Sequence, residues 1–293
     1  MVRNDGGGDF RITTIQLKTI QHKENTVEII KRLPKKRKQI KAALFDFDGK
    51  ISTLRYGWES VMEPLMLEMI TGGGPADDEL VSEVRDYIDQ STGIQTYYQM
   101  LWLAETVKRY GRNRSASEDP WWYKAEYNRR LMEIVEKRKR FLLQKDKTNT
   151  DFLMKGAEGF LKELNNKSIA IYVASGTDDP DVKKEAEVLG LTGYFKEIAG
   201  APPGKADCSK EAVLRRLVDD HGLTGSEVVV IGDGKVEIAL GRQVGAVTLG
   251  IASDEVMRCG VDNVKRARLI KAGAHAIVGD FERSEEIFDW LGL

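Results

Sequence analysis

Cysteine and histidine are scarce in this sequence, which has two cysteines and three histidines among its 293 residues. Cys208 and Cys259 form no C-x-x-C pair, so the sequence indicates neither a disulfide framework nor a zinc site. His22, His221 and His275 show no H-x-x-x-H pairing, and we predict that they are ordinary surface or core histidines.

An excess of one sign of charge is also absent. Lysine and arginine together number 45, against 46 acidic residues, which removes the usual argument for a nucleic-acid binder. No apolar run approaches ~20 residues, and the N-terminus "MVRNDGGGDF" lacks the apolar segment of a signal peptide. We therefore expect a cytoplasmic protein, a monomer or homodimer, that has neither a nucleic acid nor a membrane as its partner.

The hydrophobic pattern divides the chain into three parts. Residues 1–40 are predicted to be an N-terminal extension, with a candidate edge strand in "RITTIQLKTI" and a basic run, "KRLPKKRKQIK". That run resembles a nuclear-import or nucleic-acid patch, but a solvated linker is the favoured interpretation. Residues 57–150 show apolar side chains at three- and four-residue intervals, which predicts a helical module. Its last helix is expected to begin at residue 123, after a break at 111–120.

The third part, residues 41–56 and 151–293, alternates apolar strands with amphipathic helices. Apolar strands joined by helices predict a parallel sheet that is covered on both faces. The predicted fold class is therefore α/β, with a Rossmann-like three-layer core and an inserted all-helical domain.

Three of the predicted strands end in polar groups, in "FDFDG", "YVASG" and "VIGDG". A strand buried in the sheet has no use for such side chains, because an unpaired charge in an apolar setting is very unfavourable. The carboxyl ends of parallel strands meet on one side of a sheet. We therefore expect Asp46, Asp48, Ser175 and Asp233 to converge there.

This set suits phosphoryl transfer through an aspartyl-phosphate. Asp46, the first residue out of its strand, is the candidate nucleophile. Asp48 lies on the same side of an extended chain and can protonate the leaving oxygen, then deprotonate water. Two carboxylates would repel a phosphate dianion unless a divalent cation lay between them, and Mg²⁺ fits. Asp233 is a further candidate ligand, and Glu237 could bind the metal or orient a metal-bound water. Ser175 and a cation would hold the non-bridging oxygens.

The stretches "DFDGK", "VASG", "KEAVLRRLVDDHG" and "IGDGKVE" resemble the four motifs of the haloacid dehalogenase-like hydrolases. The helical module falls where that superfamily inserts its larger helical cap. The resemblance implies a Mg²⁺-dependent enzyme with Asp46 as nucleophile, Asp48 as acid and base, and Ser175, with Gly176 beside it, at the phosphate. The implied metal set is Asp46, Asp48, Asp233 and Glu237.

Two lysines compete for the cation of the third motif. Lys210 is favoured, because its distances to Gly222 and Asp233 match the family's usual spacing, and Lys205 in "APPGK" is the alternative. The stretch "GAPPGKA" does not match a P-loop, since its glycine spacing is one residue short and Ala206 replaces the required Ser or Thr.

The chain departs from the family pattern at two positions. Lys50 stands where the family usually has threonine or valine, and it is expected either to contact substrate or to face solvent. Glu237 stands where aspartate is more common. The presence of Asp48 favours the phosphatase and phosphomutase branches, because the dehalogenase and phosphonatase branches lack a carboxylate at this position.

Contacts to the rest of the substrate are expected from loops of the cap, since loops at helix ends reach where helix faces cannot. We predict that Arg55 near the hinge, and the loop around Thr92, Gly93 and Gln95, bind the substrate. The alternative is that this loop only connects two helices. In that case selectivity would lie with Trp121, Trp122 and Lys124.

The sequence thus predicts a phosphatase that acts on a small phosphorylated metabolite, most simply a sugar phosphate. A cap that closes over the core would exclude water and bulky polymers. A phosphomutase of the β-phosphoglucomutase type is the first alternative, because it would use the same residues. A non-catalytic binding module with a vestigial site is the second.

Overall fold

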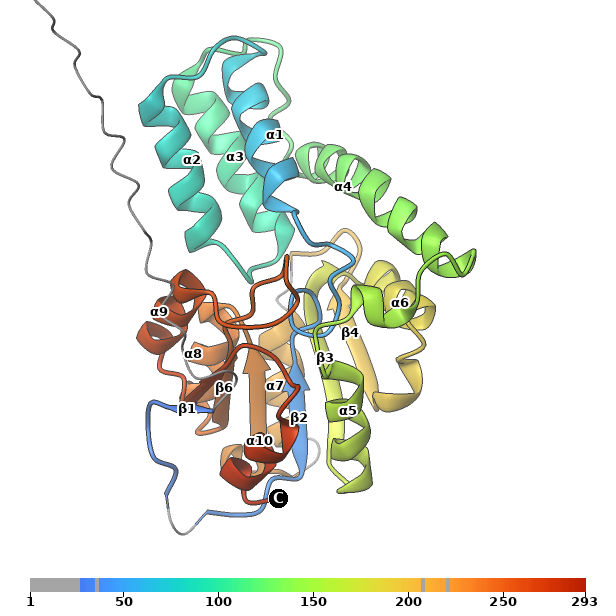
Figure 1. The fold of residues 1–293 in the computed structure, drawn as a ribbon. Coiled ribbons are helices and arrows are strands. Elements are labelled where there is room, and N and C mark those ends of the chain that lie inside the picture. The colour runs from blue at the N-terminus through green and yellow to red at the C-terminus, as the bar shows by residue number, and fades with distance from the viewer. Residues whose placement is uncertain (1–26, 35–36, 207–208, 220–221) are drawn as a thin grey trace, which may run out of the picture.

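The computed structural model describes residues 27–34, 37–206, 209–219 and 222–293. Several sequence-based predictions fall outside these residues, namely the strand expected at 11–20, His22, Cys208, His221 and part of the basic run. Within the described residues the chain forms an α/β core with a helical cap above it (Figure 1).

The core is built on a seven-stranded sheet, within the described residues, of order β1-β7-β6-β5-β2-β3-β4. All neighbouring strands are parallel except β1, which pairs antiparallel with β7 at one edge and was not predicted. The strands span Glu28–Ile29 (β1), Ala42–Phe45 (β2), Ala170–Asp178 (β3), Glu197–Ala201 (β4), Val228–Gly232 (β5), Val247–Ile251 (β6) and Ala276–Val278 (β7).

Helices cover both faces of the sheet, because alternate residues of each buried strand point to opposite sides. Ala43 and Phe45 of β2 face a cluster that includes α5, α6 and α10, whereas Ala42 and Leu44 face α7 and α8. These α-helices and α9 span Ala157–Asn166 (α5), Asp179–Val188 (α6), Ser209–Asp219 (α7), Lys235–Gln243 (α8), Asn263–Ala272 (α9) and Ser284–Leu291 (α10). Single-turn 3₁₀ helices span Asn149–Phe152 (η1), Thr192–Tyr194 (η2) and Gly225–Glu227 (η3).

Four helices between β2 and η1 form the cap and bury their own hydrophobic cluster, separate from that of the core. The last helix begins at Pro120, three residues earlier than predicted, because Asp119 caps it and proline suits the first helical position. Trp121 and Trp122 are therefore helical. The cap helices span Glu59–Thr71 (α1), Asp78–Gln90 (α2), Thr96–Tyr110 (α3) and Pro120–Leu143 (α4).

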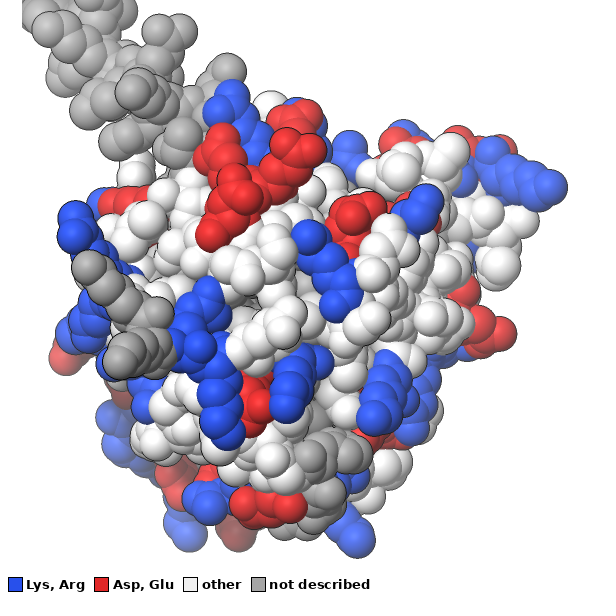
Figure 2. All heavy atoms as spheres, turned by 90° about the horizontal axis from the view of Figure 1, so that it is seen from below, with Lys and Arg blue, Asp and Glu red and all other residues white. Residues whose placement is uncertain are grey.

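Charge is mixed on the face of the core that lies away from the cap, where lysine, arginine and acidic side chains alternate (Figure 2). This agrees with the near balance of charge in the sequence. None of the helices in the described residues combines the length and the apolar character that a membrane span needs.

Candidate functional site

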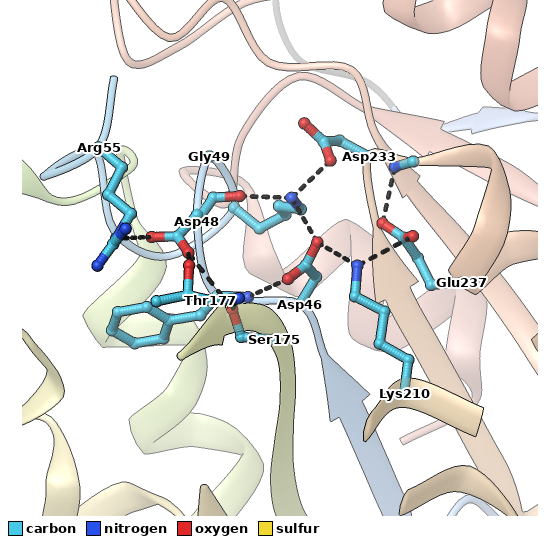
Figure 3. A network of polar contacts seen from close by, with 12 residues as sticks. Asp46, Asp48, Gly49, Arg55, Ser175, Thr177, Lys210, Asp233 and Glu237 are labelled. Atoms are coloured by element: carbon cyan, nitrogen blue, oxygen red, sulfur yellow. Dashed lines mark hydrogen bonds and ion pairs between the residues drawn. The ribbon is translucent and has the colours of Figure 1, made fainter. Parts of the chain in front are cut away.

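The site lies where β2 ends between its two neighbours. Phe45, the last residue of β2, is paired with Val173 of β3 on one side and Ile231 of β5 on the other. The residues that follow these positions therefore emerge at one edge of the sheet, facing the cap. The structure brings together six residues that the sequence nominated: Asp46, Asp48, Ser175, Lys210, Asp233 and Glu237 (Figure 3).

Asp46 is buried and held on both carboxylate oxygens. The backbone N–H of Phe47 donates to Oδ1 at 2.9 Å, and Lys210 Nζ donates to Oδ2 at 2.8 Å. Lys50 Nζ also lies 2.8 Å from Oδ2. Burial alone would raise the pKa of Asp46, but the two ammonium groups outweigh it and lower that pKa. The structure thus keeps this carboxylate ionised and fixed.

Asp48 lies in a different environment. Thr177 Oγ1 donates to its Oδ2 at 2.8 Å and Ser175 Oγ to the same atom at 3.4 Å. Its Oδ1 accepts no hydrogen bond from the described residues. Burial raises the pKa of Asp48, against the opposing effect of Arg55. The two carboxylates therefore shift in opposite directions, although they are two residues apart.

Thr177 is a contact that the sequence reasoning missed. It lies two residues beyond Ser175 on β3, so its side chain points to the same side of the strand. A second hydroxyl at this spacing in "VASGTD" was the available signal.

The two candidate lysines of the third motif lie in very different environments in the structure. Lys210 is buried against Asp46, and its Nζ also lies 3.3 Å from Glu237 Oε2. Glu237 in turn accepts the N–H of Gly234 at 2.7 Å, which fixes it at the start of α8. Lys205 is exposed and does not line the cavity, and its backbone carbonyl accepts the side-chain amide of Gln95 at 2.8 Å.

Three carboxylates at the site could hold a metal ion. One oxygen each from Asp46, Asp233 and Glu237 lie within 4.8 Å of one another, and all three residues are buried. Buried carboxylate oxygens of this kind suit a hard cation such as Mg²⁺. The backbone carbonyl of Asp48 faces the same space, since it accepts from Lys50 Nζ. The donor set therefore fits the predicted metal.

Lys50 lies inside this cluster. It is 4% exposed, and its Nζ lies 2.5 Å from Asp233 Oδ1 as well as against Asp46. The expectation that it faces solvent is wrong; it is buried and contributes to the cavity wall. Burial would lower its pKa, but Asp233, Asp46 and Glu237 raise that pKa well above the usual value.

Arg55 joins the hinge of the cap to the core. Its guanidinium donates to Glu185 of α6 at 2.7 and 3.0 Å and lies 3.5 Å from Asp181 Oδ2. Its Nε is also 4.0 Å from Asp48 Oδ1, and Arg55 lines the cavity, where the predicted contact with substrate would take place. Glu185 is fully buried, and this burial raises its pKa to about 7 despite the ion pair.

The loop between α2 and α3 closes the cavity from the cap side. Thr92, Gly93 and Ile94 line the cavity, which has a volume of about 100 Å³. Gly93 has a positive φ and passes so close to Glu237 that a Cβ would lie 3.0 Å from its Oε2. A Cβ on Gly176 would lie 2.9 Å from the carbonyl oxygen of Ile94. Both glycines therefore permit close contact between cap and core.

Gln95 is directed away from the cavity lining. Its side-chain amide donates to the carbonyl of Lys205, so it ties the cap loop to the segment after β4. The neighbouring Thr96 lines the cavity in its place. Lys124 pairs with Asp178 and Trp121 packs on Tyr97, while Trp122 is exposed.

Comparisons with known proteins agree with this geometry. A family model described as haloacid dehalogenase-like hydrolase matches residues 40–245. A phosphoserine phosphatase of Methanocaldococcus jannaschii is 29% identical over 100 residues, which is 31% of this chain and 47% of that protein. The match thus spans about half the length of this curated relative.

Solved structures share the fold at low identity. A predicted phosphoglycolate phosphatase from Haemophilus somnus superposes with a TM-score of 0.58 at 14% identity, covering 85% of this chain and 98% of that one. A β-phosphoglucomutase from Clostridium difficile superposes with a TM-score of 0.54 at 18% identity, covering 87% and 98%. At these identities the likeness concerns the arrangement of core and cap.

Proposed function

Because this chain belongs to the haloacid dehalogenase-like hydrolases, we propose that it is a Mg²⁺-dependent phosphatase of small phosphorylated metabolites. The enzyme class predicted from the sequence, a phosphoric monoester hydrolase, is supported by the family and by the phosphoserine phosphatase among its relatives. The observation that carries the proposal is the contrast between Asp46 and Asp48. One carboxylate is fixed between ammonium groups, and the other is held by hydroxyls, with one oxygen that accepts no hydrogen bond from the part of the chain that the structure describes.

In the proposed reaction Asp46 attacks the phosphorus atom, and the bond between phosphorus and the leaving oxygen breaks. Asp48 donates its proton to that oxygen, which departs as an alcohol. Water then attacks the aspartyl-phosphate after Asp48 has taken up one of its protons. Inorganic phosphate leaves, and Asp46 is restored.

Other groups of the chain would hold the phosphoryl oxygens during both steps. Lys210 lies against Asp46, and Ser175 lies beside Asp48, so a cation and a hydroxyl flank the point of attack. Asp46, Asp233, Glu237 and the carbonyl of Asp48 are the groups that would hold Mg²⁺. When bound, the ion would neutralise the charge that develops on the phosphoryl group.

The cavity favours a small substrate. The small cavity beneath the cap loop, about 100 Å³ in volume, favours a compact phosphate ester over a polymer. We propose a sugar phosphate or a compound of similar size. Arg55, Thr96 and Tyr127 line the cavity and would contact this substrate.

A phosphomutase is the second candidate, since the fold is shared with a β-phosphoglucomutase. Both activities can be tested with one panel of sugar and three-carbon phosphates, incubated with the purified protein and Mg²⁺. Release of inorganic phosphate that stops with excess chelator and returns with Mg²⁺ supports the phosphatase. Isomerisation that needs a bisphosphate primer, with little phosphate release, would favour the phosphomutase. Neither activity on any ester would leave the non-catalytic binding module as the better description.

A further inference from the structure

The ammonium group of Lys50 occupies the centre of the predicted metal site. Its Nζ lies 2.8 Å from Asp46 Oδ2 and 2.5 Å from Asp233 Oδ1, and it donates to the backbone carbonyl of Asp48. These three oxygens come from the end of β2, from the turn after it and from the end of β5. The same oxygens would be needed to hold a divalent cation at this point of the sheet.

An ammonium and a divalent cation cannot share this space. Both would have to lie within about 3 Å of the same oxygens, where the repulsion between like charges is strong and little water screens it. The buried carboxylates are already compensated, because Asp46 contacts Lys50 and Lys210, and Asp233 contacts Lys50 and Lys265. Without a metal, the cluster therefore does not carry an uncompensated negative charge.

The ammonium group of Lys50 can also move into the adjacent cavity. Lys50 lines the same cavity as the cap loop, and its side chain has four rotatable bonds, so the ammonium can leave the carboxylates without movement of the backbone. Lys210 differs, because it reaches Asp46 from α7 and contacts Glu237 rather than Asp233.

We propose that Lys50 is a resident cation that competes with divalent metal for the site between Asp46, Asp233 and the carbonyl of Asp48. Metal binding displaces the ammonium into the cavity, so the protein binds Mg²⁺ more weakly than a chain with a small neutral residue at this position. In the metal-free protein, Lys50 holds the three oxygens together and stabilises the site. The inference concerns the metal site of the proposed function and is independent of the substrate.

The test measures metal binding without substrate. Mg²⁺ binding is followed by calorimetry and Mn²⁺ binding by electron paramagnetic resonance, for the wild type, Lys50→Thr and Lys50→Met. We expect Lys50→Thr to bind both ions roughly 10- to 100-fold more tightly than the wild type. Lys50→Met removes the charge but keeps much of the volume, so its affinity should lie between the two.

Lys265→Met is the matched control, because Lys265 Nζ lies 3.2 Å from the other oxygen of Asp233 but not between the ligands. It should gain clearly less affinity than Lys50→Thr. Equal gains in affinity in the two variants would mean that the overall positive charge around the site weakens metal binding. That result would overturn the proposal. So would an unchanged affinity in Lys50→Thr and Lys50→Met.

Thermal unfolding supplies a second measurement. Metal-free Lys50→Thr should unfold at a lower temperature than the wild type, because it leaves buried carboxylates short of a cation. Mg²⁺ should raise the Tm of the variant more than that of the wild type. If the variants do not fold, wild-type crystals soaked in Mn²⁺ decide the matter. Mn²⁺ at the carboxylates with Lys50 Nζ moved away supports the proposal, and both cations on the same oxygens would refute it. The result is the same whether or not the protein proves to be a phosphatase.

Discussion

The edge of the core sheet and the cap loop face each other across one cavity, but the side chains that they place there differ in charge. The core side presents buried, ion-paired groups, among them Asp46, Lys50 and Lys210. The cap side presents Gly93, Ile94 and other neutral residues, which pack closely against the core. The contrast indicates that the core carries the chemistry, while the cap sets the space left for the substrate.

The hinge between these regions contacts both the core and the cap. Arg55 lies on the segment that leads from β2 into the cap, yet its partner Glu185 belongs to α6 of the core. It also approaches Met132 of α4 in the cap, with 3.7 Å between Nη2 and Sδ. Substitutions in the core, at the hinge and in the cap loop should therefore have effects of decreasing size and different kind.

The largest effect is expected in the core, at Asp46. Asp46→Asn preserves the shape of the side chain but removes the attacking charge, so phosphatase turnover should fall by at least ~10³ with the fold retained. Turnover is measured as phosphate release, and folding by circular dichroism. A variant that keeps a tenth of wild-type activity on any ester would show that Asp46 is not the nucleophile.

The second prediction compares two lysines of the core. Lys210→Ala removes the ammonium that lies 2.8 Å from Asp46 and should lower kcat/KM by about 10² to 10⁴. Lys205→Ala should have a mild effect, because the side chain of Lys205 is exposed. The same kinetic assay measures both variants. If Lys205→Ala were the crippled variant, the third motif would lie five residues upstream.

The third prediction concerns the hinge and is measured as stability. The pKa of Glu185, about 7 in the folded protein, lies above the usual value of 4.5 for glutamate. The folded state therefore binds this proton more tightly than the unfolded state, and its stabilising effect is lost as the pH rises from about 4.5 to about 7. Glu185→Gln cannot titrate, so the free energy of unfolding of the wild type should fall relative to that of Glu185→Gln by roughly 2 kcal/mol between pH 5 and pH 8.

Urea denaturation of both proteins at the two pH values provides the check. A difference between them that does not change with pH would mean that the ion pair with Arg55 keeps Glu185 ionised throughout. The hinge would then behave like the ion-paired core rather than as an intermediate between core and cap.

The smallest effect is expected in the cap loop. Replacing Thr96, which lines the cavity, by alanine should change kcat/KM by about 3- to 10-fold on individual sugar phosphates and alter their ranking. Activity on a small aryl phosphate should be largely kept, because the core groups remain. A uniform loss on every ester, or no change, would show that the loop is scaffold, and selectivity would then be sought at Trp121, Trp122 and Lys124.

Much of the fold was predictable because its signals are local. Buried strands have short apolar runs, cap helices have apolar residues at helical spacing, and both patterns are carried by consecutive residues. The start of α4 at Pro120 has a local cause as well, since proline is common in loops but also favours the first position of a helix. The antiparallel strand β1 is two residues long and has too little pattern to detect.

The position of the carboxylates follows from the sequence alone, because residues that follow buried parallel strands emerge at the same edge of the sheet. Asp46, Asp48 and Asp233 could be placed together on that ground alone. The structure was needed to choose between Lys210 and Lys205 and to show that Lys50 contacts the same carboxylates. A lysine has a long and flexible side chain, so its ammonium contacts whichever carboxylates the fold brings near it. Asp233 lies 183 residues after Lys50 in the sequence, and no local pattern links the two. The pair of Arg55 with Glu185 and the contact of Thr177 with Asp48 could not be predicted either, because each joins segments far apart in the sequence.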